Sequence, residues 1–176
     1  VSVIIPNFNG MAYLDGVLAG LECQSVNNFE VILVDNGSSD GSCAFVAARY
    51  PWVHLIELPE NFGFCKAVNE GIKASRAPYV LLLNNDIEVT ENFIEEMIFA
   101  IKRHPKAFSC AARMIQFHDR DKLDDAGNYY CALGWAYARG KGKDIHTYEK
   151  EEKIFASCAG AAIYRKKIFD KIGYFD

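Results

Sequence analysis

The stretch VLLLNNDIEV, residues 80–89, determines both the expected fold and the expected site. Its first four residues are continuously apolar, which is typical of a strand buried on both faces of a parallel sheet. The apolar run ends on two amides and a carboxylate, Asn84, Asn85 and Asp86. Because ligands of open parallel sheets bind outside the carboxyl ends of the strands, this stretch predicts a buried strand followed directly by a ligand-binding loop.

The same unit recurs along the first half of the chain. Apolar, strand-like runs occupy residues 1–6, 29–34, 52–58 and 79–83. Apolar residues at helical spacing follow each run, around residues 14–21, 43–50, 65–75 and 93–101, and Thr90 is the expected N-cap of the fourth helix. This alternation predicts an α/β protein with a Rossmann-like, mostly parallel sheet and helices on both faces.

The second half is expected to be irregular. Residues 108–117 predict a strand, residues 118–153 are mostly polar and predict loops, and residues 154–164 and 165–175 predict a last strand and helix. We expect one domain over 1–176, with a change of character near residue 105. Since the chain opens directly in a strand and stops at GYFD, we also expect it to be cut from a longer protein.

Composition argues against several classes of protein. The formal net charge of −4 leaves no basic field, so nucleic acid is not an expected partner. No apolar run reaches the roughly 18–20 residues that a transmembrane segment needs. The six cysteines lie 20 or more residues apart, which rules out a local CxxC pair and predicts reduced thiols in a cytoplasmic protein.

Polar residues follow all four predicted strands. The clusters are Pro6, Asn7, Phe8 and Asn9; Asp35 and Asn36; Asn61 and Gly63; and Asn84, Asn85 and Asp86. Any one cluster is explained by the turn that leaves a strand. Together they predict a ligand site at one edge of the sheet, where helix N-termini also point.

The usual phosphate-binding signatures do not follow the first strand. Neither GxGxxG nor GxxxxGK[ST] is found there, and DNGSSDGSCAFV lacks the glutamate that closes a calcium loop. A diphosphate bound at this edge would therefore need another counter-charge. A hard cation held by Asp86 could supply it.

Four motifs in order and spacing resemble the nucleotide-sugar glycosyltransferases of family two, which have the GT-A fold. They are VSVIIPNFNG, VILVDNGSSDG, ENFGFCKAVNEGI and VLLLNNDIEV. DDAGNYY, ARGKGKD, ASCAGAAIYRK and IGYFD further resemble the rhamnosyltransferase-like subgroup. The resemblance covers essentially the whole chain and makes residues 1–105 the nucleotide-binding half and residues 106–176 part of the acceptor half.

The resemblance also implies roles for single residues. Phe8, in the loop with Pro6, Asn7 and Asn9, matches the aromatic residue that stacks on the nucleotide base, and Asp35 matches the carboxylate that contacts base or ribose. Asn61, Gly63 and Lys66 match the loop near base and diphosphate. Asn84, Asn85 and Asp86 occupy the DxD position with its first acid replaced by Asn. Asp86 is thus the expected ligand of Mg²⁺ or Mn²⁺.

The implied reaction is metal-dependent, inverting transfer of a sugar from a UDP- or dTDP-sugar to a hydroxyl of a glycan or lipid-linked acceptor, as in polysaccharide biosynthesis. Two alternatives stay open. One is a non-catalytic nucleotide-sugar binding module; the other is a sugar-phosphate nucleotidyltransferase, although IPNFNGMAYL lacks the basic, glycine-rich loop of that class.

The general base of the reaction is expected beyond Asp176, because the motif that IGYFD resembles continues into an acidic segment. Asp124 and Asp125 are alternative candidates within the chain. The full-length protein is expected in the cytoplasm, with peripheral association at the inner face of the membrane.

Overall fold

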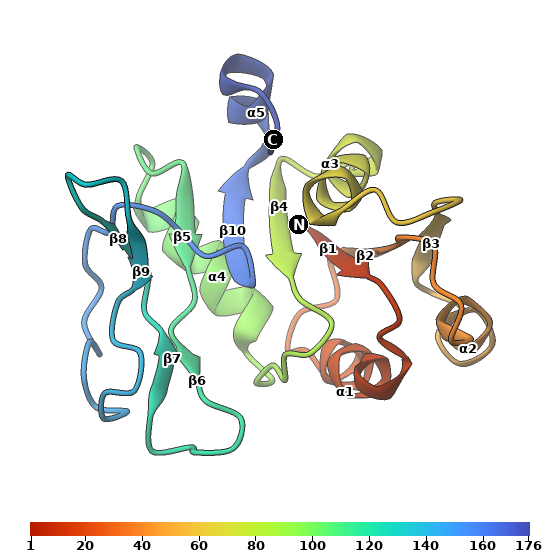
Figure 1. Cartoon of the computed structure of the whole chain (residues 1–176), viewed down its shortest axis with the longest axis horizontal. Coiled ribbons are helices and arrows are strands. Elements are labelled where there is room, and N and C mark those ends of the chain that lie inside the picture. Colours follow the sequence, from red (N-terminus) through yellow and green to blue (C-terminus); the bar gives the residue numbers. More distant parts are fainter.

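A computed structural model of the protein describes all residues from 1 to 176 and is built on one six-stranded sheet with the order β3-β2-β1-β4-β10-β5 (Figure 1). Its first four strands are β1 (Ser2–Asn7), β2 (Glu30–Asp35), β3 (His54–Glu57) and β4 (Tyr79–Leu83). These four are mutually parallel, with Asn7 opposite Asp35 at the carboxyl ends of β1 and β2. The predicted parallel sheet is therefore present.

Helices cover both faces of this sheet, as predicted (Figure 1). The helices α1 (Met11–Glu22), α2 (Ser42–Arg49) and α4 (Phe93–Arg103) pack on one face, and α3 (Phe64–Ala74) and α5 (Lys166–Ile172) pack on the other. Successive strand residues alternate between the two cores, so that Val3 and Ile5 face α1 and α4 whereas Ile4 faces α3. The strands are continuously apolar because both of their faces are buried.

Helix α3 approaches β1 so closely that a glycine is needed at their contact. A Cβ atom on Gly71 would lie 2.4 Å from Cγ2 of Ile4 and 3.2 Å from Cγ2 of Val34. This close approach brings the first turn of α3 to the carboxyl ends of β1 and β2.

The second half differs from the predicted pattern in detail. The strand predicted over 108–117 is two short strands, β5 (Ser109–Ala111) and β6 (Met114–Ile115), and the predicted loop region contains β7 (Leu123–Asp125), β8 (Asn128–Tyr130) and β9 (Ala136–Ala138). The predicted last strand is confined to β10 (Ala161–Arg165), which runs antiparallel between β4 and β5. Strands of two or three residues are too short to produce a periodic pattern.

The start of α4 was also predicted wrongly. Its cap position is Asn92 rather than Thr90, and neither residue caps the helix with its side chain. Buried Gln24 does so instead, because its Oε1 atom accepts a hydrogen bond from the Ile94 amide at 2.9 Å. Its Nε2 atom donates to the Thr90 carbonyl oxygen at 2.8 Å. A cap supplied from about 70 residues away leaves no local signal.

All six cysteines are free thiols in this structure. None of the helices combines the length and the apolar character that crossing a membrane requires.

Candidate functional site

An open pocket of about 350 Å³ lies where the carboxyl ends of the parallel strands meet the start of α3. Its lining comes from the loops that follow β1, β2, β3 and β4 and from α3. The lining residues are Pro6, Asn7, Phe8, Asn36, Asn61, Gly63, Phe64, Ala67, Asn84, Asn85 and Asp86. The structure therefore brings together eight of the eleven site residues that the sequence predicts.

Asn7 connects the ends of three strands. Its buried side chain donates from Nδ2 to Oδ1 of Asp35 at 2.8 Å, across the register of β1 and β2. Its Oδ1 atom accepts a hydrogen bond from Nδ2 of Asn85, after β4, at 2.7 Å. A buried amide with both ends paired has a single favourable orientation, so Asn7 fixes the loops after β2 and β4 relative to β1.

Gly10 makes room for this connection. A Cβ atom at Gly10 would lie 2.0 Å from Nδ2 of Asn85 and 2.4 Å from Oδ1 of Asn7. These are the two atoms of the hydrogen bond between Asn7 and Asn85. Any larger residue at position 10 must therefore disturb the pocket wall, which explains the glycine in NFNG.

Asp35 lies behind the pocket rather than in its lining. Its side chain is only 2% exposed, and its Oδ2 atom accepts the Ser38 amide hydrogen bond at 2.8 Å. Burial alone would raise the pKa of Asp35, but hydrogen bonds from Ser38, Asn7 and Cys43 outweigh burial and lower it. Asp35 is therefore ionised at neutral pH. Burial and the neighbouring Asp35 in turn raise the pKa of the Cys43 thiol to about 12.

Asn36 is a pocket residue that the predicted set omitted. It donates from Nδ2 to Oδ1 of Asn61 at 2.8 Å and to the Gly63 carbonyl oxygen at 3.1 Å, and its Oδ1 atom accepts from the Phe62 amide at 3.0 Å. It thus holds the loop before α3 against the end of β2. The signal was available, because Asn36 belongs to the polar cluster after the second strand.

Aromatic rings line part of the pocket. Phe8, from the loop after β1, and Phe64, the first residue of α3, are both exposed. Phe8 was predicted as the aromatic contact, whereas Phe64 and its neighbour Ala67 were not. In the sequence, Phe64 is marked by the glycine before it. Gly63 has a φ of 86° and is the last residue of the loop that Asn36 holds.

Asp86 is the one carboxylate in the lining, and no Lys, Arg or His side chain accompanies it. Its side chain is exposed and takes part in none of the side-chain hydrogen bonds or ion pairs of the structure. The backbone of the same loop is anchored, because the Asn84 amide donates to the Gly160 carbonyl oxygen, just before β10, at 2.8 Å. Asp86 is thus free to bind a ligand from a fixed loop.

Asn9 and Lys66 lie outside the lining. Asn9 has a positive φ of 50° and accepts at Oδ1 from the Ser39 amide at 2.9 Å, so it ties the first loop to the loop after β2. Lys66 is exposed and forms an ion pair with Glu70, with 2.9 Å between Nζ and Oε1. The Asp35, Asn9 and Lys66 side chains are therefore adjacent to the pocket in this structure but turned to other partners.

A mostly parallel sheet covered on both faces, with an amide-lined pocket at its carboxyl edge, places the protein among the α/β proteins that bind ligands at this edge of the sheet. The family model described as "Glycosyl transferase family 2" matches residues 2–173. The chain belongs to this family.

Curated relatives agree. Glycosyltransferase GlyG of Streptococcus pneumoniae is 29% identical over 133 residues, which cover 74% of this chain and 39% of GlyG. An N-acetylglucosaminyl-diphospho-decaprenol L-rhamnosyltransferase of Mycobacterium tuberculosis is 24% identical over 197 residues, covering 99% of this chain and 64% of the relative. The chain thus spans between about two fifths and two thirds of the lengths of these relatives.

Solved structures show that the fold is GT-A. Staphylococcus aureus TarS 1–349 in complex with UDP-GlcNAc superposes with a TM-score of 0.72 at 21% identity, over 99% of this chain and 48% of TarS. The mannosyltransferase PcManGT from Pyrobaculum calidifontis, in complex with GDP-Man and Mn²⁺, gives a TM-score of 0.70 at 16% identity, over 99% and 47% of the two chains.

Proposed function

We propose that this chain carries the donor site of an inverting, metal-dependent glycosyltransferase that moves a sugar from a UDP- or dTDP-sugar to a hydroxyl of a glycan or lipid-linked acceptor. The observation that carries the proposal is the lining of the pocket. It combines exposed aromatic rings, five asparagine side chains and one unpartnered carboxylate, Asp86, at the edge of the sheet where nucleotides bind.

The nucleoside end of the donor is proposed to lie beside Phe8 and Phe64, whose exposed rings offer stacking surfaces. That Asp35 contacts the base or ribose stays a prediction. In this structure its carboxylate accepts hydrogen bonds from Asn7 and Ser38, so a nucleoside would have to share or replace those donors. The UDP-GlcNAc complex of TarS supports a nucleotide-sugar as the class of donor.

The diphosphate needs a positive partner that the pocket lining does not contain. The lining carries the charge of Asp86 and no cationic side chain, so a diphosphate would meet like charge. A hard cation with oxygen ligands fits this donor set only in part, because no group of three His, Cys, Asp or Glu side chains is present. We infer that Mg²⁺ or Mn²⁺ is held by Asp86 together with donor phosphates, consistent with the Mn²⁺ in the PcManGT complex.

When bound, the cation neutralises charge on the leaving diphosphate. The chain itself supplies orientation: Asn84 and Asn85 present amide groups at the pocket wall, and Asn7 holds Asn85 in place. Inversion requires the acceptor hydroxyl to approach the sugar opposite to the diphosphate in one displacement. We expect the acceptor to enter beside Gly160, which contacts the Asn84 loop.

The general base is proposed to lie beyond Asp176. The alternative candidates are engaged elsewhere: Asp124 pairs with Lys141 at 3.2 Å, and buried Asp125 accepts the Gly127 amide hydrogen bond. If residues 1–176 alone transfer sugar at the rate expected for an enzyme with a base, which contributes roughly 10² to 10⁴-fold, this assignment is wrong. A non-catalytic binding module would also bind the donor without turnover. Assaying a longer stretch of the natural protein for sugar transfer would distinguish this module from an enzyme whose base lies beyond Asp176.

Calorimetric titration with UDP and dTDP, in Mn²⁺ and in EDTA, tests the donor site. The wild-type chain is expected to lose at least tenfold in affinity without Mn²⁺, whereas Asp86→Asn should bind weakly in both conditions. Glu88→Gln is the matched control, because Glu88 is an exposed carboxylate two residues away that pairs with Arg120 at 2.8 Å. Unchanged Mn²⁺ dependence in Asp86→Asn would refute the role of Asp86.

A further inference from the structure

Exposed apolar side chains gather on the hairpin of β8 and β9, which forms a two-stranded sheet separate from the central sheet (Figure 1). Leu133 in its turn is 85% exposed and Trp135 is 73% exposed. Phe155 is 70% exposed and stacks on Tyr130 with 5.3 Å between ring centroids. The apolar hairpin is defined here as residues 128–138 with Phe155. Exposed apolar groups gathered in this way mark interaction surfaces rather than ordinary surface variation.

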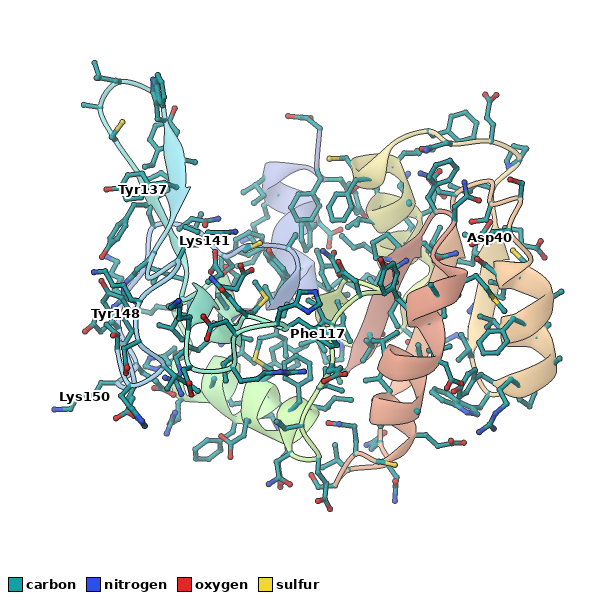
Figure 2. All side chains as sticks on the ribbon, turned by 60° about the horizontal axis from the view of Figure 1, so that its bottom comes forward. Asp40, Phe117, Tyr137, Lys141, Tyr148 and Lys150 are labelled. Carbon is teal, nitrogen blue, oxygen red and sulfur yellow. The ribbon has the colours of Figure 1, made fainter.

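The distribution of charge indicates what the apolar hairpin contacts. Residues 126–138 contain no charged side chain, and residues 139–143 then place Arg139, Lys141 and Lys143 without an intervening acid. Arg139 is buried and paired with Glu152. Lys141 and Lys143 are exposed; Lys141 forms a solvent-exposed ion pair with Asp124 at 3.2 Å, and Lys143 donates to the Tyr148 hydroxyl at 3.1 Å. Figure 2 shows Tyr137 on the projecting hairpin and Lys141 nearer the body of the protein. An apolar, aromatic tip backed by lysines complements a phospholipid surface, with its acyl region and anionic headgroups.

Two other occupants fit less well. A glycan could use the hydroxyl groups of Tyr129, Tyr130 and Tyr137 on the strands, but the most exposed part of the hairpin, the turn around Leu133, offers only Ala132, Leu133 and Gly134 beside Trp135. A second copy of the chain would bring the same lysines, Lys141 and Lys143, towards one another across a two-fold interface. Trp and Tyr rings are also the side chains that prefer the boundary between headgroups and acyl chains.

We propose that the apolar hairpin inserts into the interface of a phospholipid bilayer, with Leu133 and Trp135 entering first. The segment that carries Phe155 continues to the donor pocket: Ala156 bridges to Asn128, and the Gly160 carbonyl oxygen accepts from the Asn84 amide. Insertion would therefore hold the acceptor side of the pocket close to the membrane. That consequence rests on the proposed function and selects a lipid-linked acceptor, whereas the insertion itself does not depend on it.

Tryptophan fluorescence can test insertion directly, because the chain has two tryptophans, Trp52 and Trp135. In the Trp52→Phe variant, emission comes from Trp135 alone. Adding phosphatidylcholine vesicles should shift this emission to the blue, and brominated acyl chains should quench it. Including phosphatidylglycerol should strengthen binding, in a manner that salt reduces, since the lysines then meet anionic headgroups.

A sedimentation assay with the same vesicles supplies the mutational test. The double variant Leu133→Ser with Trp135→Ser should bind vesicles at least tenfold more weakly, because it removes two large apolar groups from the contact. Phe99→Ser is the control, since Phe99 is 53% exposed on α4, away from the hairpin. Thermal unfolding and UDP titration should be unchanged in both variants, which separates this proposal from the donor site.

Three results would overturn the proposal. The first is no change in Trp135 emission with vesicles of either composition. The second is equal sedimentation of the double variant and the wild type. The third is a concentration-dependent dimer, or a complex with soluble polysaccharide, that forms without vesicles and is lost in the double variant.

Discussion

Replacing Asn7 with alanine should destabilise the fold and loosen the pocket together. The substitution removes the hydrogen bond to ionised Asp35, at 2.8 Å, and the bond from Asn85, at 2.7 Å. A hydrogen bond to a charged group contributes about 1.5–3 kcal/mol and a neutral one about 0.5–1.5 kcal/mol. We therefore expect a loss of roughly 2–4.5 kcal/mol from a total that is typically about 5–15 kcal/mol.

The size of this loss should depend on pH. Because hydrogen bonding lowers the folded-state pKa of Asp35, ionised Asp35 contributes stability above its unfolded pKa, and this contribution disappears as the pH falls through the folded pKa. Asn7 is one of the donors that lower the pKa. The destabilisation by Asn7→Ala should therefore be largest near neutral pH and shrink in acid.

Urea unfolding followed by circular dichroism is the appropriate assay. The midpoint should fall while the slope of free energy against urea stays constant, since the same surface is exposed on unfolding. Asn28→Ala is the control, because Asn28 is exposed in the loop before β2 and its φ is not positive. A loss below about 0.5 kcal/mol for Asn7→Ala, or an equal loss at neutral and acid pH, would refute the role given to Asn7.

Two further predictions concern the same edge of the sheet. Gly10→Ala should cost about 1–3 kcal/mol in urea unfolding, because its Cβ would overlap the hydrogen bond between Asn7 and Asn85; Gly16→Ala, with nothing within 4 Å of its Cβ, should instead stabilise α1 by about 0.5–1 kcal/mol. If Asp35 contacts the nucleoside, Asp35→Asn should weaken the binding of UDP and of free uridine by similar free energies, about 1–3 kcal/mol. Calorimetric titration measures both affinities. A loss of affinity for UDP but not for uridine would show that Asp35 does not contact the nucleoside.

The sequence predicts the first half of the fold well for a physical reason. Strands buried on both faces must be continuously apolar, and helices that cover them must be apolar on one side. Each of these elements can therefore be predicted from its own residues. Short strands such as β6 and β8 depend on pairing partners and carry no such pattern. The antiparallel position of β10 between β4 and β5 is likewise determined by tertiary contacts, and the local sequence does not predict it.

The sequence predicts which loops form the site, but it predicts less well which side chains of those loops line the pocket. Residues at the end of a strand can be assigned to the correct edge, but the direction of each side chain depends on its neighbours. Asp35 turns to its register partner Asn7, whereas the next residue, Asn36, reaches the pocket wall. Phe64 lines the pocket from the first turn of α3, a helix whose close approach to β1 at Gly71 is a tertiary contact.

The polar edge of the sheet has two layers, and the layers should respond differently to mutation. Asp35 and Asn7 form a buried layer whose hydrogen bonds are satisfied within the protein, so changes there act first on stability. Asp86 belongs to an exposed layer without protein partners, so removing its charge costs the fold little. Asn85 joins the two layers, because it lines the pocket and donates to Asn7. A variant at Asn85 should therefore lose both stability and donor affinity, whereas Asp86→Asn should lose affinity alone.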